Sequence, residues 1–324
     1  MSISEKIIEF IRSLLKDSIE SALTLFKVMI PIVVGVKILQ DSGLITYVAM
    51  PLEPIMGLVG LPAETGFVWA GAIVNNVYTG LIIFMSLAQD ITLTQQQATV
   101  LAVLMLVAHA LPLESAVSRK AGARFLFQAF IRMLGAFALG AILHLVYSAG
   151  DMFTQPASIM FSPSVTQDPT ITKWALGQAR NFGYIFIVIM TLMAIMRLLT
   201  ACGVIEILNK ILRPILKIIG IGPKASAITV IGLTVGLTYG SGLIIKEARS
   251  GNLSKQDVFY SVTLMGMSHA LIEDTFLLML IGAHFSGIFW GRFLFSIVAV
   301  ALLVRIVRHL PPRFCDRFLW TDPS

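Results

Sequence analysis

Apolar runs separated by short polar stretches fill most of the 324 residues of this chain. Several runs reach the roughly 20 residues that a helix needs to cross a bilayer. Helices are the expected spanning elements, because lipid offers backbone N–H and C=O groups no hydrogen-bond partners. The pattern predicts two sets of five apolar segments, at about 21–40, 44–60, 64–88, 96–118 and 122–147, and at about 180–200, 204–220, 223–247, 256–282 and 286–307.

The stretches outside these segments are polar or amphipathic. In residues 1–20, apolar side chains recur at helical spacing and charged side chains fill the other face, which predicts an amphipathic helix. This helix can lie on the membrane surface or pack against the protein. Residues 148–179 begin with a Pro-, Ser- and Thr-rich sequence typical of a linker, and residues 308–324 form a basic tail.

The two sets of segments repeat each other at a spacing of 160 residues. "LEPI" at 52–55 falls on "LRPI" at 212–215, in short segments that can span, re-enter or lie at the interface. "HAL" at 109–111 falls on "HAL" at 269–271. An odd number of crossings in each copy inverts the second copy in the membrane. The sequence therefore predicts an all-α polytopic membrane protein made of two inverted-topology repeats, 21–147 and 180–307.

Composition and charge agree with this interpretation. Hydrophobic residues make up 56% of the chain and charged residues 13%, against about 25% charged residues in a typical soluble domain. The formal net charge of +6 comes largely from loops and termini, which argues against nucleic acid as a partner. Lys and Arg accumulate in 118–124, in 246–255 and in the tail, and such stretches face the cytoplasm. Both termini are therefore predicted to be cytoplasmic.

The third segment of each repeat carries glycine, amide and hydroxyl groups. In inverted-repeat transporters, broken helices from both halves meet near the midplane and bind the substrate there. Small and hydroxylated residues also let helices pack closely, but paired buried amides are costly in lipid and favour a binding role. The predicted substrate-binding residues are Asn75, Asn76, Tyr78, Thr79, Thr234, Thr238, Tyr239 and Ser241.

The fourth and fifth segments carry ionisable groups, which are functional candidates when they lie within a membrane. His269 and Glu273 are four residues apart and are predicted to share a helix face. Pro112 is predicted to bend the helix between His109 and Glu114. The residues predicted to couple ions or protons are His109, Glu114, Arg132, His269, Glu273, Asp274 and Arg292, and a metal site would use His109, Glu114, His269 and Glu273. Each arginine is predicted to pair with an acid or contact the solute.

Two copies with "HALPLES" and "SHALIEDTFLL", each after a Gly-, Asn- or Thr-rich helix, resemble the bacterial nucleoside-recognition (Gate) domain membrane proteins, which include the spore maturation proteins A and B. The resemblance covers nearly the whole chain as two fused Gate domains, 21–147 and 180–307. It implies a multi-pass protein of the bacterial cytoplasmic (inner) membrane. The family name implies a nucleoside-like solute.

Several functions agree with these features. The leading hypothesis is a secondary transporter of a small polar solute, nucleoside-like by resemblance and coupled to protons or another cation, with divalent metal-ion transport as the runner-up. A non-transporting membrane scaffold is a further alternative. An intramembrane metal enzyme is disfavoured because the chain has no HExxH motif, so we expect no enzymatic activity. Expected partners are membrane lipid and a small polar solute or cation. No cofactor is expected unless a divalent metal binds, and a homo-oligomer is compatible with the sequence.

Overall fold

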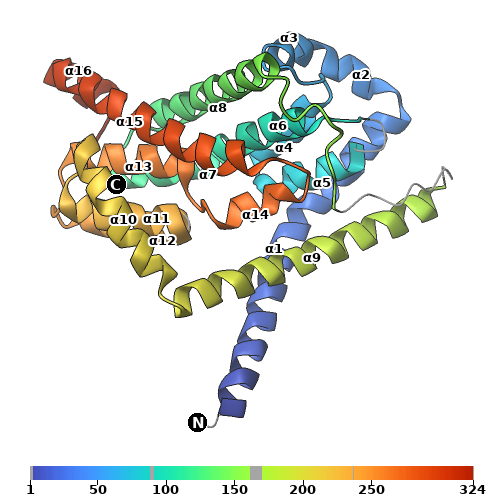
Figure 1. Cartoon of the computed structure of the whole chain (residues 1–324), viewed down its shortest axis with the longest axis horizontal. Helices are drawn as coiled ribbons and strands as arrows, with labels where there is room; N and C mark the ends of the chain where they lie inside the picture. The colour runs from blue at the N-terminus through green and yellow to red at the C-terminus, as the bar shows by residue number, and fades with distance from the viewer. Residues whose placement is uncertain (1–2, 88–90, 161–169, 236, 324) are drawn as a thin grey trace.

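The computed structural model describes residues 3–87, 91–160, 170–235 and 237–323, and it is helical without a strand in that part of the chain (Figure 1). Five of the described helical stretches are long and apolar enough to cross a membrane, namely Ile8–Asp41, Gln95–Ala121, Phe125–Ala149, Ile171–Ala201 and Ser286–His309. The chain is an all-α polytopic membrane protein, as the sequence predicts.

The first half runs from α1 to α8. Its elements are α1 (Ile3–Asp41), α2 (Leu44–Ala49), η1 (Met50–Leu52), α3 (Glu53–Gly57), α4 (Thr65–Val74), α5 (Val77–Leu87), α6 (Gln95–Val107), α7 (Leu111–Ala121) and α8 (Phe125–Ala149). The predicted helix over 1–20 is not a separate element, because α1 continues without interruption from Ile3 to Asp41.

The second half repeats this order. Its elements are α9 (Ile171–Ala201), α10 (Val204–Ile219), α11 (Pro223–Val235), α12 (Leu237–Arg249), α13 (Lys255–Ser268), α14 (Glu273–Met279), η2 (Ser286–Gly291), α15 (Arg292–His309) and the terminal α16 (Pro312–Phe318). Helix α9 begins earlier than the predicted start of the second repeat at residue 180. Helix α10 continues through Pro214, whereas the equivalent stretch around Pro54 is divided into short pieces.

Equivalent helices of the two halves run in opposite directions. Arg124, at the start of α8, donates hydrogen bonds to the carbonyls of Asp316 and Trp320, which follow α15 in the chain. At the other end of α8, Tyr147 Oη lies 2.8 Å from Ser286 Oγ, at the start of η2 and α15. Figure 1 shows α8 and α15 crossing the body side by side. Their antiparallel course is the geometry of an inverted repeat.

The third apolar segment of each half is a helical hairpin rather than a single helix. Helices α4 and α5 pack against each other, and so do α11 and α12. Close packing of each hairpin uses a glycine at an equivalent position, Gly80 in α5 and Gly240 in α12. Gly80 lies inside a regular helix, and the chain breaks earlier, at Asn75 and Asn76.

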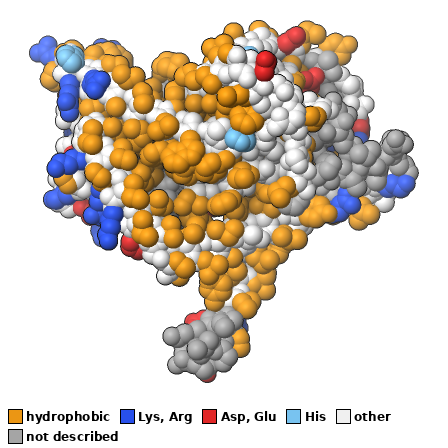
Figure 2. Space-filling model, viewed as in Figure 1, with side chains coloured by type: hydrophobic (Ala, Val, Ile, Leu, Met, Phe, Trp, Pro, Cys, Tyr) orange, Lys and Arg blue, Asp and Glu red, His pale blue; other side chains and the backbone are white. Residues whose placement is uncertain are grey.

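The surface agrees with a membrane position. Hydrophobic side chains cover the middle of the face seen in Figure 2, whereas Lys and Arg side chains gather at the edge where α16 and the C-terminus lie. Two of the predicted cytoplasmic stretches, 118–124 and the C-terminal tail, are hydrogen-bonded to each other at that end, because Thr321 N–H donates to the carbonyl of Gly122. Lys255 Nζ also lies 2.7 Å from Asp322 Oδ1 there.

Candidate functional site

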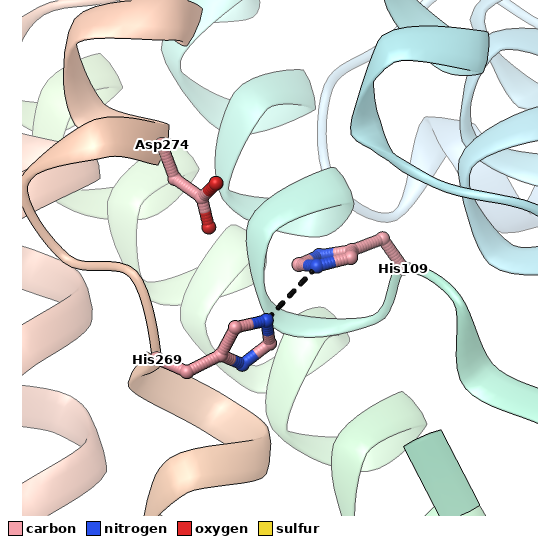
Figure 3. Close-up of side chains that lie close together, drawn as sticks. All are labelled: His109, His269 and Asp274. Atoms are coloured by element: carbon pink, nitrogen blue, oxygen red, sulfur yellow. Dashed lines mark hydrogen bonds between the residues drawn. The ribbon is translucent and has the colours of Figure 1, made fainter. Parts of the chain in front are cut away.

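The fourth segment of each half breaks in its middle, and the two breaks meet. Helix α6 ends at Val107 and α7 begins at Leu111, whereas α13 ends at Ser268 and α14 begins at Glu273. At equivalent positions in the two breaks, Ala110 and Ala270 adopt left-handed backbone conformations with φ of 45° and 46°. The sharp turn at each alanine ends one helix and re-aims the next, so that His109 and His269 face each other (Figure 3).

Both histidines are held in the same way. His109 and His269 are 6% and 4% exposed, and their Nε2 atoms lie 3.1 Å apart. The Nδ1 atom of each ring lies against a main-chain carbonyl four residues earlier, 3.0 Å from Met105 O and 2.8 Å from Met265 O. A carbonyl oxygen only accepts hydrogen bonds, so each Nδ1 carries a proton, and in a neutral ring each Nε2 then presents a lone pair to the other ring.

Glu114 of α7 lies against the two rings. Its Oε1 is 3.4 Å from His109 Nε2 and 3.3 Å from His269 Nε2. Its Oε2 accepts a hydrogen bond from Arg132 Nη1 at 2.5 Å. Arg132 also donates to the carbonyls of Val107 and His109, which the break leaves without helical partners. This arginine therefore stabilises the break and orients Glu114 at the same time.

Arg292 stabilises the second break in an equivalent but looser arrangement. It donates to the carbonyls of Met267 and His269, as Arg132 does to Val107 and His109. Its Nη1 lies 3.6 Å from Asp274 Oδ2, too far for a hydrogen bond, and neither atom has another hydrogen-bond partner among the residues that the structure describes. The site is therefore symmetric in its histidines and asymmetric in its ion pairs.

The sequence-based placement of Glu273 is wrong. Because α13 ends before His269 and α14 begins at Glu273, these two residues do not share a helix face. Glu273 Oε1 instead accepts a hydrogen bond from Tyr78 Oη at 3.4 Å. A ligand atom of Asp274, rather than of Glu273, lies within 4.8 Å of ring nitrogens of both histidines, a spacing that can hold a metal ion.

Three of the predicted substrate-binding residues of the first hairpin, Asn75, Asn76 and Thr79, hydrogen-bond one another. Asn76 Oδ1 accepts a hydrogen bond from the backbone N–H of Thr79, which satisfies a free donor at the start of α5. Asn75 Nδ2 donates to Thr79 Oγ1 at 2.5 Å. In the second hairpin, Thr234 Oγ1 donates to the carbonyl of Val230 in its own helix. The side chains of Thr238, Tyr239 and Ser241 lie outside the described part of the chain.

Sequence reasoning missed the main-chain groups of the site. The carbonyls of Met105 and Met265 orient the rings, and those of Val107 and Met267 accept from the arginines. Every residue has a main-chain carbonyl, so the residue type does not indicate which carbonyls belong to the site. The signal in the sequence is the repeat itself, because every one of these pairs is separated by 160 positions.

The left-handed alanines give a direct test of the breaks. Ala110→Val is expected to lower the free energy of unfolding by about 1–2 kcal/mol, because a β-branched residue fits the left-handed region poorly. Ala110→Gly should be tolerated, since glycine adopts this conformation freely. Equilibrium unfolding in mixed detergent micelles measures both. Equal losses for the two variants would show that side-chain packing, rather than the backbone turn, governs this position.

Comparison with known proteins agrees with a membrane protein. The chain is 26% identical over 292 residues to YvoD, an uncharacterized membrane protein of Bacillus subtilis (strain 168), and the alignment covers 88% of this chain and 90% of that protein. No protein-family model and no solved structure matches the chain. An alignment of this length spans most of both halves.

Proposed function

We propose that this chain is a secondary transporter of a small polar solute or ion, and that the cluster around His109 and His269 is its translocation site. The observation that carries this proposal is the 3.1 Å contact between Nε2 atoms contributed by the two halves. Alternating access moves one repeat against the other around a fixed central site. His109 and His269 come from opposite repeats and lie at helix breaks. A movement of one repeat against the other would therefore change the distance between the two rings.

The geometry favours an ion at this site. Two ring lone pairs and a carboxylate oxygen converge there, and all three accept positive charge. These polar groups are expensive to bury in a membrane protein without a function. A packing role alone does not need two histidines whose lone pairs face each other.

A nucleoside-like solute is the second candidate, and the resemblance to Gate domain proteins favours it. Tyr78 lies beside the cluster, where its hydroxyl contacts Glu273, so an aromatic face and a carboxylate are available near the helix break. Asn75, Asn76 and Thr79 bond among themselves, and a nucleoside would have to exchange those hydrogen bonds for its own. A non-transporting scaffold would bind neither an ion nor a nucleoside at these residues.

We also propose the bacterial cytoplasmic membrane as the location, with both termini in the cytoplasm. The basic stretches that gather at one end of the molecule support this orientation. We propose no enzymatic activity for the chain.

Uptake into proteoliposomes tests the transporter proposal. Vesicles containing the purified chain should accumulate either Co²⁺, read by an internal chelating dye, or radiolabelled uridine, at least tenfold faster than empty vesicles. His109→Gln should abolish the uptake, because it removes one of the two facing lone pairs. His309→Gln is the matched control, since His309 contacts a carbonyl four residues earlier in the same way but is exposed. Rates equal to those of empty vesicles for both probes would contradict the proposal and favour a scaffold.

A further inference from the structure

We infer that His109 Nε2, His269 Nε2 and carboxylate oxygens of Glu114 and Asp274 form a binding site for one divalent transition-metal ion of the zinc or cobalt class. For its biological role this inference rests on the proposed function, which it deepens by naming the class of cation. Binding itself requires no transport.

When both rings are neutral, the centre of the cluster holds no hydrogen. Both Nδ1 atoms are occupied as donors to Met105 O and Met265 O, so both Nε2 atoms are acceptors. Glu114 Oε1 is an acceptor as well. Three lone-pair-bearing atoms within 3.4 Å of one another repel unless a positive charge lies among them.

The spacing of these three atoms fits a metal ion. Zinc binds nitrogen and oxygen ligands at about 2.0–2.1 Å in a tetrahedron, which places any two ligand atoms about 3.3 Å apart. The three distances in the cluster are 3.1, 3.3 and 3.4 Å. The atoms therefore already form a triangle of the size of one tetrahedral face, without rearrangement of the backbone.

Asp274 supplies the fourth ligand. Its Oδ2 has no hydrogen-bond partner among the described residues, although the side chain is only 13% exposed. A ligand oxygen of Asp274 already lies within 4.8 Å of ring nitrogens of both histidines, so a small side-chain movement brings it to a shared ion (Figure 3). An unsatisfied carboxylate oxygen at this place needs an explanation, and a bound cation gives one.

The groups that hydrogen-bond the proposed ligands are of the kind found around metal sites. A metal-bound histidine donates its other ring N–H to a carbonyl or carboxylate, which fixes the ring and its tautomer. The carbonyls of Met105 and Met265 do this for the two rings. Arg132 holds the far oxygen of Glu114, which leaves Oε1 directed at the rings.

The charge of the cluster is compatible with uptake of a cation. The carboxylates of Glu114 and Asp274 pair with the guanidinium groups of Arg132 and Arg292, and the third carboxylate, Glu273, contacts the hydroxyl of Tyr78. With neutral rings and ionised carboxylates, these groups carry one net negative charge. Imidazole ligands select zinc, cobalt or nickel, whereas magnesium and calcium prefer all-oxygen sites.

Cobalt binding to the full chain in detergent tests the inference. Titration with Co²⁺ should give visible d–d absorption typical of a tetrahedral site, saturating at one ion per chain and displaced by Zn²⁺ but not by excess Mg²⁺. His269→Gln and Asp274→Asn should each weaken Co²⁺ binding at least tenfold. His309→Gln should leave it unchanged, because His309 lies on the exposed end of α15.

Each outcome decides one question. Absence of the absorption band, or equal Co²⁺ binding in wild type, His269→Gln and Asp274→Asn, overturns the metal site even if the chain transports uridine. Co²⁺ binding without uptake of either Co²⁺ or uridine in proteoliposomes overturns the transporter proposal and leaves the metal site standing. Asp274→Asn keeps the size of the side chain, so it reports on the ligand if His269→Gln fails to fold, as judged by gel filtration.

Discussion

Arg132→Met is expected to lower the free energy of unfolding by about 3–5 kcal/mol, because it leaves the largely buried carboxylate of Glu114 without its charged partner. The same substitution removes the donors to the carbonyls of Val107 and His109. Equilibrium unfolding in mixed detergent micelles, followed by tryptophan fluorescence, measures the loss.

Arg292→Met is the matched control, and it should cost clearly less. Arg292 donates to the carbonyls of Met267 and His269, so the variant loses the same kind of carbonyl partners. It does not lose a short ion pair, because Asp274 lies 3.6 Å away. The difference between the two variants therefore measures how much more the short Glu114 pair contributes than the longer Asp274 pair.

A double variant checks the cause. Arg132→Met combined with Glu114→Leu removes both charges, so it should be more stable than Arg132→Met alone, since a buried pair replaced by apolar groups often costs little. Equal losses in Arg132→Met and Arg292→Met, with no recovery in the double variant, would show that the arginines act only through the carbonyls.

The repeat and its chemistry were predictable from the sequence because side chains carry them. His109, Glu114 and Arg132 are recognisable as costly groups within apolar segments, and the copies at His269, Asp274 and Arg292 show that they belong together. Apolar length and composition identified the membrane helices for the same physical reason. The prediction that the second repeat is inverted in the membrane relied on the odd number of segments in each repeat.

The breaks were not predictable in detail, because no residue type marks them consistently. The chain turns at Ala110 and Ala270, and alanine favours a continuous helix. Pro112 follows the first break, but the second copy has Ile272 at that position and breaks without a proline. Tertiary hydrogen bonds hold the turns instead, since Ala110 N–H donates to Ala72 O and Leu271 N–H donates to Leu233 O.

The hairpins were missed because buried helices show no amphipathic period. Residues 64–88 are apolar on all sides and long enough to span, so hydrophobicity cannot distinguish one crossing from a re-entrant pair. Asn75 and Asn76 divide this stretch into two short helices. Asn75 ends α4, and Asn76 accepts a hydrogen bond from a backbone N–H at the start of α5. Their amides were interpreted as ligands for a solute, although their hydrogen bonds in the structure are local.

Gly240→Val is expected to destabilise the protein by more than the about 1–3 kcal/mol typical of an overpacked core. A Cβ atom at Gly240 would lie 2.5 Å from Gly232 Cα in the facing helix, and a backbone atom cannot move aside as a side chain can. Gly80→Val should act in the same direction in the first hairpin, where the added Cβ would lie 2.9 Å from the carbonyl oxygen of Val68. Unfolding in mixed micelles measures both losses.

Gly242→Val provides the control within the same helix, because a Cβ atom added there meets no described atom within 4 Å. It replaces glycine with a better helix former, so its effect should be neutral or slightly stabilising. The hairpins place the breaks that hold His109 and His269, since Ala72 and Leu233 of the hairpins accept hydrogen bonds from Ala110 and Leu271. A loose hairpin should therefore also weaken Co²⁺ binding in Gly240→Val and not in Gly242→Val. Equal stability of these two variants would contradict the close crossing of α11 and α12.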